Sequence, residues 1–363
     1  MNGITVNSNF SRQEIVEMLA INDKTEYDLL ISKAYSIKEK FVGKIAYLRG
    51  LIEFSNICFK DCFYCGIRNG NGKITRYSMS DDEILKVVYY AYKNRINGIV
   101  LQSGEKKSYS FTKRISDLIY SIKDKTNPEF RITLSLGEQT AETYNEWFAA
   151  GAQRYLLRIE TTNGDLYRKI HPDDNLHSYK TRRECIENIQ KAGFQTGTGV
   201  MIGLPFQKVE DLADDLLFMK NNEIDMVGMG PYLEHADTPL YDYKDSLIPL
   251  KKRMRLSLGM IAVLRILMPE INIASSTALQ SIDPVGRELG LLAGANILMP
   301  NITPLKYKNS YQLYNNKPCI DEDSAICLRN LKSSVQKIGE TISFDDYGDS
   351  RHYKNKTIKN IYS

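Results

Sequence analysis

The stretch YLRGLIEFSNICFKDCFYC, residues 47–65, joins a β-like apolar run to three closely spaced cysteines. Seven similar runs follow, and segments with helical periodicity lie between them. Alternating strands and helices, with strands that read as near-continuous apolar runs, predict a parallel sheet covered by helices. Eight repeats close most naturally as an α/β TIM-type (β/α)8 barrel, with a doubly wound sheet as the rival. The runs are YLRGLIEF (47–54), GIVLQSG (98–104), RITLSLG (131–137), RYLLRIE (154–160), TGVMIGLP (198–205), MVGMGPY (226–232), INIASST (271–277) and NILMPN (296–301).

The segments before the first run and after the last run indicate how the chain is organised into domains. No linker rich in Pro, Gly and Ser divides the chain. We expect an N-terminal helical extension over residues 1–45, the barrel over residues 46–305, and a C-terminal segment over residues 306–363 that closes the barrel. Helical periodicity is clear after the first run, where Ser80 and Glu83 have the spacing of a capping box ahead of an apolar face.

Composition describes a globular protein of 363 residues, with 42% hydrophobic and 25% charged residues. Its 48 Lys and Arg against 44 Asp and Glu leave a net charge of +4, too small to predict binding to nucleic acid or to an anionic membrane. No apolar run approaches the roughly 18 residues of a membrane span, and the first residues lack the apolar region of a signal peptide. We therefore expect a cytoplasmic protein, where clustered cysteines serve a metal or catalysis rather than disulfides.

Polar side chains gather where the predicted strands end. Any single group could be an ordinary polar loop, but six groups together favour a shared site. In a TIM barrel the strand ends form one face, and that face carries the active site. The groups are Gln102, Ser103 and Glu105; Ser135 and Glu138; Arg158 and Glu160; Tyr232 and His235; Ser276 and Thr277; Asn301 and Thr303.

The cysteine loop has the spacing Cys58-x3-Cys62-x2-Cys65. A structural zinc site closes a tetrahedron with four ligands, and no fourth cysteine or histidine lies near, so zinc is disfavoured. Thiolates also hold iron–sulfur clusters, where four cysteines complete a [4Fe–4S] site. Three cysteines leave one iron without a protein ligand, and an open metal position can bind a substrate or a cofactor.

The CxxxCxxC spacing, with the aromatic Tyr64 before the last cysteine, resembles the radical S-adenosylmethionine (SAM) superfamily. The resemblance implies that Cys58, Cys62 and Cys65 hold a [4Fe–4S] cluster whose open iron chelates the amino and carboxylate groups of SAM. An electron from the cluster then cleaves SAM to methionine and a 5'-deoxyadenosyl radical. Tyr64 is expected beside the adenine, through its ring or its backbone.

Longer strings extend the resemblance to the HydE family, the radical SAM maturases of [FeFe]-hydrogenase. It implies an anionic substrate, an iron–cysteine complex carrying CO and cyanide, which the partner maturase HydG delivers for assembly of the H-cluster. Reduced ferredoxin or flavodoxin is the expected electron donor. The strings span roughly residues 45–320 and are IEFSN, RYSM, IVLQSGE, TLSLGE, RYLLRIET, GVMIGLP, DMVGMGP, DTPL, GANILMPNITP and YQLY.

The resemblance also implies which residues contact SAM. The string QSGE (102–105) stands where many relatives have Gly-Gly-Glu, which contacts the methionine amino group. Arg158 and Arg182 match arginines that contact SAM, and a guanidinium suits a carboxylate because its fork binds with two parallel bonds. For Arg182 the alternative is a solvated charge on a helix. The expected contacts are Tyr64, Gln102, Ser103, Gly104, Glu105, Ser135, Arg158, Glu160, Arg182 and Met201.

Five further residues match positions around the substrate. Arg49, Ser276 and Thr277 match residues that line an anion-binding pocket deep in the barrel, and Tyr311 and Tyr314 match tyrosines near it. An unpaired buried charge is costly, so Arg49 either faces an anionic substrate or forms an internal salt bridge with a strand carboxylate.

Three other positions carry weaker signals. Many HydE proteins have a second cluster site, Cys-x7-Cys-x2-Cys. Here Cys319 and Cys327 keep the first spacing but Asn330 takes the third position, so we predict that this second site is empty or labile and is not needed for the chemistry. Cys185 shares a helix face with apolar residues and is expected to be buried, and His235 is interpreted as structural.

Besides a hydrogenase maturase, two functions remain open: a radical SAM mutase or sulfur-inserting enzyme on the same barrel, and a non-enzymatic iron–sulfur scaffold. A radical SAM mutase like methylornithine synthase would need a pocket for the amino acid group of lysine. Sulfur insertion like that of biotin synthase would need further cysteines in the strands, which the chain lacks. A non-enzymatic iron–sulfur scaffold would not cleave SAM.

Overall fold

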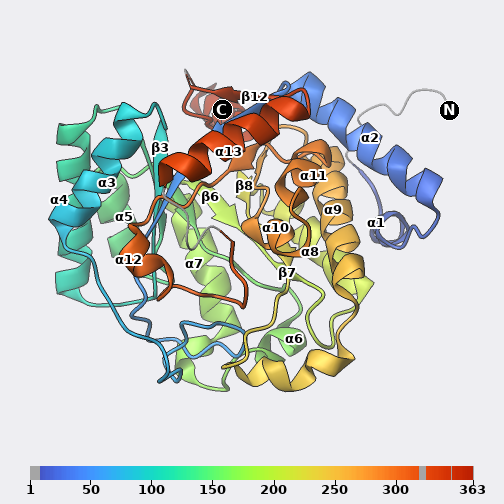
Figure 1. Ribbon diagram of the computed structural model, residues 1–363, viewed down its shortest axis with the longest axis horizontal. Helices are drawn as coiled ribbons and strands as arrows, with labels where there is room; N and C mark the ends of the chain where they lie inside the picture. The colour runs from blue at the N-terminus through green and yellow to red at the C-terminus, as the bar shows by residue number, and fades with distance from the viewer. Residues whose placement is uncertain (1–8, 319–323, 345, 363) are drawn as a thin grey trace.

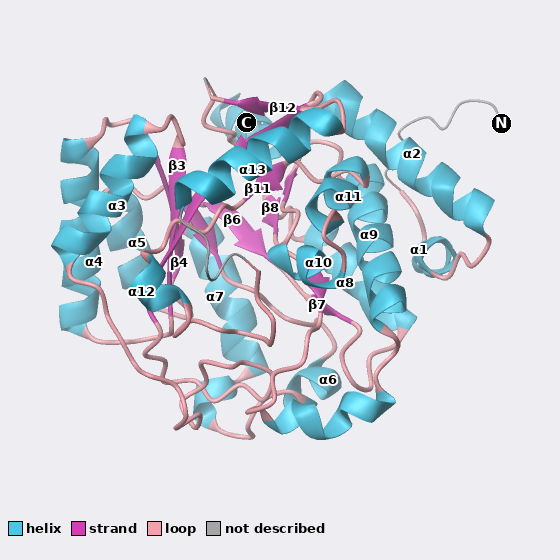
Figure 2. Ribbon diagram, in the orientation of Figure 1, coloured by secondary structure: helices cyan, strands magenta, loops and turns pink. Residues whose placement is uncertain are grey.

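The computed structural model describes residues 9–318, 324–344 and 346–362. Figure 1 shows strands enclosed by helices, and Figure 2 separates the two by colour. The strands are β1 Ile45–Leu48, β2 Gly50–Ser55, β3 Gly98–Ser103, β4 Arg131–Ser135, β5 Arg154–Leu156, β6 Gln195–Thr198, β7 Met201–Ile202, β8 Met226–Val227, β9 Gly230–Pro231, β10 Asn272–Ile273, β11 Ile297–Leu298 and β12 Thr341–Ser343. The α-helices are α1 Arg12–Leu19, α2 Lys24–Phe41, α3 Asp81–Lys93, α4 Tyr109–Lys125, α5 Ala141–Ala149, α6 Gly164–Lys169, α7 Tyr179–Lys191, α8 Val209–Asn221, α9 Leu250–Leu267, α10 Thr277–Ile282, α11 Gly286–Leu292, α12 Leu305–Lys308, α13 Ser324–Lys337 and α14 Arg351–Tyr362. The 3-10 helices are η1 Asn175–His177 and η2 Pro239–Ser246.

The strands form a closed parallel barrel. Seven of them are hydrogen-bonded in the order β10-β8-β6-β5-β4-β3-β2, and β11 pairs in parallel with β1. A parallel bridge between Ala274 and Ile297 joins the ends of β10 and β11, and another between Leu51 and Asn301 connects β2 to the segment after β11. β1 and β2 are two halves of one strand, interrupted at Arg49. The predicted TIM-type barrel is therefore confirmed, and the doubly wound sheet, which would leave two open edges, is wrong.

The helices pack their apolar faces on the outside of the barrel. The capping box of Ser80 and Glu83 opens α3, which buries Ile84, Val88 and Ala91. The early helices α1 and α2 lie against α8 and α9, on the right of Figure 1. None of the helices in the described chain combines the length and apolar content that a membrane crossing requires.

The amino-terminal ends of the strands are covered by the last part of the described chain. β12 pairs in parallel with β1, and residues 346–350, which we call the floor segment, continue beneath the barrel. Asp349 of this segment accepts hydrogen bonds from Arg131 (2.9 Å), Arg154 (2.6 Å) and Gln195 (2.7 Å), at the starts of β4, β5 and β6. In Figure 1 this end of the barrel is at the top, beside β12.

The carboxyl-terminal ends of the strands form the mouth of the barrel, beside α6 in Figure 1. Residues 309–317, which follow α12, lie against the cysteine loop there. The backbone N–H of Gly66 donates to the carbonyl of Leu313 over 3.0 Å. A Cβ on Gly66 would lie 2.1 Å from the carbonyl oxygen of Gln312. Only glycine therefore fits at this position, because any larger residue would force the two segments apart.

Candidate active site

The cysteine loop begins directly after β2, at the mouth of the barrel. The backbone N–H of Glu105 donates to Sγ of Cys58 over 3.3 Å, so the end of β3 meets the first cysteine. Gly104 permits this approach because a Cβ there would lie 2.4 Å from the carbonyl oxygen of Ile57 and 2.7 Å from Cβ of Cys58. The geometry thus brings together the cysteine loop and the end of the QSGE string.

The three cysteines of the loop are thiols rather than disulfides. Burial raises the pKa of each one, to about 12 for Cys62, and their proximity to each other adds to the rise for Cys62 and Cys65. In the described chain no three His, Cys, Asp or Glu side chains converge on a site for one ion. Cysteines that each bind a different iron of a cluster need no such convergence, and iron binding displaces their protons. The donor set fits a cluster better than a single ion.

A buried network of charges lies beside the cysteine loop. Nζ of Lys60 is 2.8 Å from Oε2 of Glu138 and 3.5 Å from Oε1 of Glu105, and Nε of Arg182 is 2.7 Å from Oε1 of Glu138. Burial opposes ionisation of Glu138, but Arg182 and Lys60 outweigh it and lower the pKa of Glu138 to about 2. Burial, followed by the charge of Glu138, raises the pKa of Glu105. The two carboxyl groups are therefore driven apart in pKa by their neighbours.

The network also corrects one interpretation made from sequence. Arg182 is buried and paired, so the alternative of a solvated helix charge is wrong. The sequence predicts Glu138 at the shared face of the barrel, but it does not identify Lys60 as a site residue. The only signal for Lys60 is its position inside the cysteine loop, which is not specific.

Arg158 and Glu160 lie together at the end of β5. Nε of Arg158 is 3.0 Å from both carboxylate oxygens of Glu160, and its two terminal nitrogens donate to the carbonyls of Gly228 (2.8 Å) and Val200 (2.9 Å). Glu160 has a φ of 65°, in the left-handed region that non-glycine residues rarely adopt. Such backbone strain is typical of functional sites. The contacts of this pair with SAM remain predictions.

An apolar cluster forms one wall of the mouth. Met201 packs with Leu166, Ile170, Leu204, Tyr232 and Leu240, and the rings of Phe63 and Tyr64 lie against them. Met201 and Tyr64, both predicted beside adenosine, therefore share one wall. The hydroxyl of Tyr64 is 3.1 Å from Nε2 of His171, which directs the ring toward α6.

The other predicted SAM residues lie around the end of β3. Gln102 is paired with Ser135 of β4 in the sheet. The hydroxyl of Ser103 donates to the carbonyl of Gly104 over 2.8 Å. Nε2 of Gln102 donates to the hydroxyl of the buried Tyr311 over 3.3 Å, which connects this side to the predicted substrate residues.

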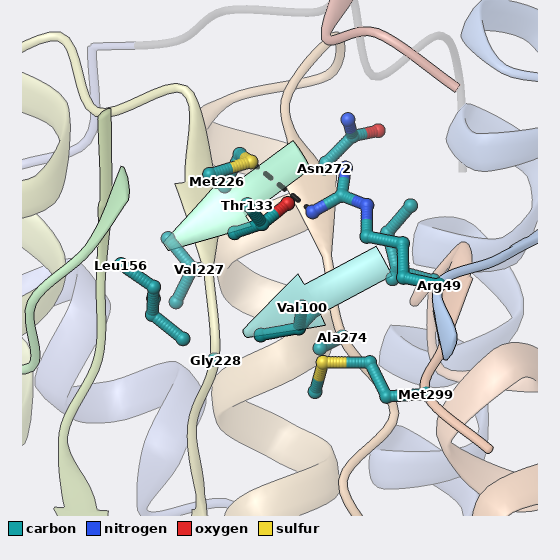
Figure 3. A pocket seen from close by; sticks show the side chains of 11 residues that line it. Arg49, Val100, Thr133, Leu156, Met226, Val227, Gly228, Asn272, Ala274 and Met299 are labelled. Atoms are coloured by element: carbon teal, nitrogen blue, oxygen red, sulfur yellow. Dashed lines mark hydrogen bonds between the residues drawn. The ribbon is translucent and has the colours of Figure 1, made fainter. Parts of the chain in front are cut away.

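Arg49 points into the interior of the barrel. Figure 3 shows its guanidinium directed toward Met226 and Asn272 across a cavity of about 20 Å³. Its terminal nitrogens donate to Sδ of Met226 (3.1 Å) and to the carbonyl of Gly348 (3.3 Å), and Nε has no partner in the described chain. Complete burial, followed by the charge of Arg154, holds the pKa of Arg49 well below its usual value, although Asp349 opposes this.

No described carboxylate lies within ion-pair distance of Arg49. The internal salt bridge weighed as its alternative is therefore not formed by the described residues. Residual positive charge remains inside the barrel, because one carboxylate, Asp349, is shared by Arg131 and Arg154 and none is left for Arg49.

The four other predicted substrate residues do not line this cavity. Thr277 and Tyr314 bring their hydroxyls to 3.1 Å from each other. Ser276 precedes α10, and its buried Oγ has no hydrogen-bond partner in the described chain. These residues lie nearer the mouth than Arg49, with Tyr311, and their contact with substrate remains a prediction.

The remaining sequence signals resolve as follows. Cys185 is buried on α7, with Sγ 3.5 Å from the carbonyl of Gln139. Nδ1 of His235 accepts from the backbone N–H of Asp237 over 3.1 Å, a structural role. Cys327 is buried in α13, whereas Cys319, its predicted neighbour, lies outside the described residues. The predicted absence of a second cluster stays a prediction.

Comparison with known proteins places this site in a family. Residues 52–219 match the model of the Radical SAM superfamily. The [FeFe] hydrogenase maturase subunit HydE of Thermotoga maritima is 41% identical over 345 residues, which cover 95% of each chain. A 3-methylornithine synthase of Methanosarcina acetivorans is 26% identical over 90% of this chain and 88% of its own. The crystal structure of methylornithine synthase (PylB) superposes with a TM-score of 0.79 at 22% identity, over 97% of this chain and 98% of that one. The three thiols at the mouth of this barrel and the extent of these matches show that the chain belongs to the HydE family of radical SAM enzymes.

Proposed function

We propose that this protein acts on an iron–cysteine precursor carrying CO and cyanide, during assembly of the [FeFe]-hydrogenase H-cluster. When bound, the [4Fe–4S] cluster supplies the electron that cleaves SAM to methionine and a 5'-deoxyadenosyl radical. Membership of the HydE family supports this function. HydG is the proposed source of the precursor, and reduced ferredoxin or flavodoxin the proposed electron donor.

The residues at the mouth of the barrel have different proposed roles. Cys58, Cys62 and Cys65 hold the cluster. Glu105 faces the amino group of SAM, because a carboxyl group beside an ammonium forms a charge-assisted hydrogen bond. Arg182 attracts the carboxylate of SAM through its buried positive charge. The apolar wall of Met201 and its neighbours excludes water around the adenosine, which favours productive use of a reactive radical.

The observation that carries the proposed substrate class is the unpaired charge of Arg49. A buried guanidinium without a carboxylate partner is expensive, and an anionic substrate would offset part of that cost. The cavity beside it has room for about one water molecule. We therefore propose that the substrate lies on the cysteine side of this cavity and that Arg49 attracts it across the cavity by its charge.

The remaining parts of the chain take supporting roles in this proposal. Residues 46–305 are the catalytic barrel, residues 1–45 a helical extension, and residues 306–363 a C-terminal segment that closes the barrel at both ends. The chain works with one cluster, because two thiols and the amide of Asn330 make a poor second site.

The test is an in vitro maturation of hydrogenase with and without this protein. Omission should abolish hydrogenase activity, and unchanged activity would count against the proposal. Arg49→Met should still produce 5'-deoxyadenosine from SAM but fail in maturation, because the change leaves the mouth intact. Arg12→Met is the control, since Arg12 pairs with Asp214 on the surface and should behave as the wild type.

The mutase alternative makes a different prediction. The likeness to methylornithine synthase shows a shared fold, so the purified protein should also be incubated with lysine, SAM and dithionite. Formation of 3-methylornithine would favour the mutase. Release of 5'-deoxyadenosine at the level of a Cys62→Ala variant would exclude both enzymes.

A further inference from the structure

The segment 170–177, between α6 and α7, is hydrogen-bonded to four residues of the cysteine loop, Lys60, Asp61, Phe63 and Tyr64. The backbone N–H of Phe63 donates to the carbonyl of Ile170 over 3.1 Å. The backbone N–H of Asp61 donates to Nε2 of His177 over 2.9 Å. The hydroxyl of Tyr64 lies 3.1 Å from Nε2 of His171, and the ammonium of Lys60 donates to a carbonyl of the same segment. Residues 60–64, between the first and last cysteines, are thus held from one side.

The tautomers of both histidines follow from their partners. Nδ1 of His177 is 2.7 Å from Oδ1 of Asp174, and a carboxylate only accepts, so Nδ1 carries the proton and Nε2 is free to accept from Asp61. The same Oδ1 accepts two backbone N–H groups of the 3-10 helix η1, at 2.9 and 3.0 Å. His177 is therefore fixed in orientation by a third group, as a metal-ligating histidine often is.

His171 is fixed in the same way on the other side of the segment. Its Nδ1 is 2.9 Å from the carbonyl of Tyr167, so it donates there and Nε2 accepts from the hydroxyl of Tyr64. The ring of His171 stacks on that of Tyr167, with centroids 3.9 Å apart. Both histidines are buried, with exposed fractions of 1% and 4%, and neither can turn away without breaking these contacts.

We propose that His171 and His177 are positioning residues that hold the cysteine loop in its ligating shape before any iron arrives. This inference rests on the proposed function insofar as it takes the loop to be the cluster site. Ligands to a metal centre have to be held within about 0.5 Å of their working geometry by packing and hydrogen bonds. Backbone hydrogen bonds within the loop, such as that from the N–H of Cys65 to the carbonyl of Cys62, supply only a small part of this support. The histidines supply acceptors for a backbone amide and for the hydroxyl between the cysteines.

The first test uses the protein without iron and measures hydrogen exchange in peptides covering residues 58–65. His177→Leu should speed exchange at the Asp61 amide by about tenfold or more, because its acceptor is lost and the loop opens locally. His177→Gln should stay within about threefold of the wild type, because Oε1 of glutamine can accept from the same N–H. His352→Leu is the matched control, since His352 also pairs with an aspartate, Asp225, but lies near the floor of the barrel.

The second test loads the same variants with iron and sulfide and follows loss of the cluster to a chelator. His177→Leu and His171→Leu should lose iron several-fold faster than the wild type, and His171→Gln should recover most of the difference. Equal exchange and equal iron loss in His177→Leu and wild type would overturn the inference, as would a glutamine variant as impaired as the leucine variant. Circular dichroism identifies a variant that does not fold. If a leucine variant fails in this way, comparison of the glutamine variants with the wild type still tests the inference. Neither measurement involves hydrogenase, so hydrogen exchange and iron loss can be interpreted even if the maturation assay fails.

Discussion

Replacement of Asp349 is expected to destabilise the whole barrel. Its carboxylate, in the floor segment, is 9% exposed and accepts hydrogen bonds from two guanidiniums and an amide. In Asp349→Ala these donors lose their common partner, and Arg154, which is fully buried and already has two unpaired nitrogens, keeps an uncompensated charge.

The magnitude follows from these contacts. Three hydrogen bonds that involve charged groups, at about 1.5–3 kcal/mol each, set an upper range of about 5–9 kcal/mol. Water entry and relaxation reduce such sums, and removal of one partner of a buried ion pair usually costs about 3–5 kcal/mol. We expect a loss of about 3–5 kcal/mol for Asp349→Ala. Asp349→Asn should lose less, because its carbonyl oxygen can still accept one of the bonds.

The assay is urea unfolding of the iron-free protein followed by circular dichroism. The control is Asp117→Ala, since Asp117 and Lys113 form an exposed pair with side chains about 60% accessible, and such pairs contribute at most about 0.5 kcal/mol. A loss below about 1 kcal/mol in Asp349→Ala would refute the reasoning, because it would mean that the floor segment does not neutralise the arginines.

The pH dependence of stability provides a second check at the same residue. Burial alone would raise the pKa of Asp349, but Arg154, Arg131 and Gln195 outweigh it and hold the pKa well below 3.8. A lowered pKa in the folded state adds stability above the unfolded value and loses it as the pH falls. The difference between wild type and Asp349→Asn should therefore persist from pH 8 to pH 5 and shrink in stronger acid.

Three other changes have defined outcomes. Glu138→Gln leaves Arg182 without its carboxylate, so formation of 5'-deoxyadenosine per bound iron should fall by about tenfold or more while iron content is unchanged; an unchanged rate would remove Glu138 from the site. Burial raises the pKa of Asp215 to about 7, so its ionisation costs stability as the pH rises from about 4 to 7, by up to about 4 kcal/mol. Asp215→Asn should flatten this decline in urea midpoints measured at pH 5 and pH 8, and an identical decline would contradict the shift. Cys327→Ser should leave about four irons per chain after reconstitution, and loss of additional irons would reveal a second cluster with Cys319.

The barrel could be predicted from sequence because its signal is local. Each of the eight apolar runs overlaps a strand, although the run 198–205 meets β6 only at its last residue, and the capping box at Ser80 marks the helix that follows the first run. The floor segment could not be predicted in the same way. Its sequence around Asp349 has no periodicity, and its partners Arg131 and Arg154 lie about 200 residues earlier in the chain. An ion pair over such a distance leaves no pattern in a single sequence.

In the candidate site, too, local signals could be predicted from sequence and long-range contacts could not. The cysteines are predicted by their spacing. Arg49 is predicted by its match to a substrate position of the HydE family, and the cost of a buried charge then implies an anionic partner for it. His171 and His177 were missed because their partners lie more than 100 residues away, so nothing near them distinguishes a positioning histidine from a surface one.

The pairing of β1 has a consequence for how the chain folds. In β1, Ile45 is aligned with Thr341 and Tyr47 with Ile297, so within the described residues the first strand pairs with β11 and β12, which come from late in the chain. Neighbouring pairs such as β2 with β3 and β3 with β4 span far shorter loops and should form first, since long loops close slowly. Until β11 and β12 arrive, the half-built sheet exposes two unpaired edges and its apolar inner face. Pairing of β1 with β11 and β12 should therefore limit the folding rate. At high protein concentration, part of the refolding protein should aggregate before these strands pair.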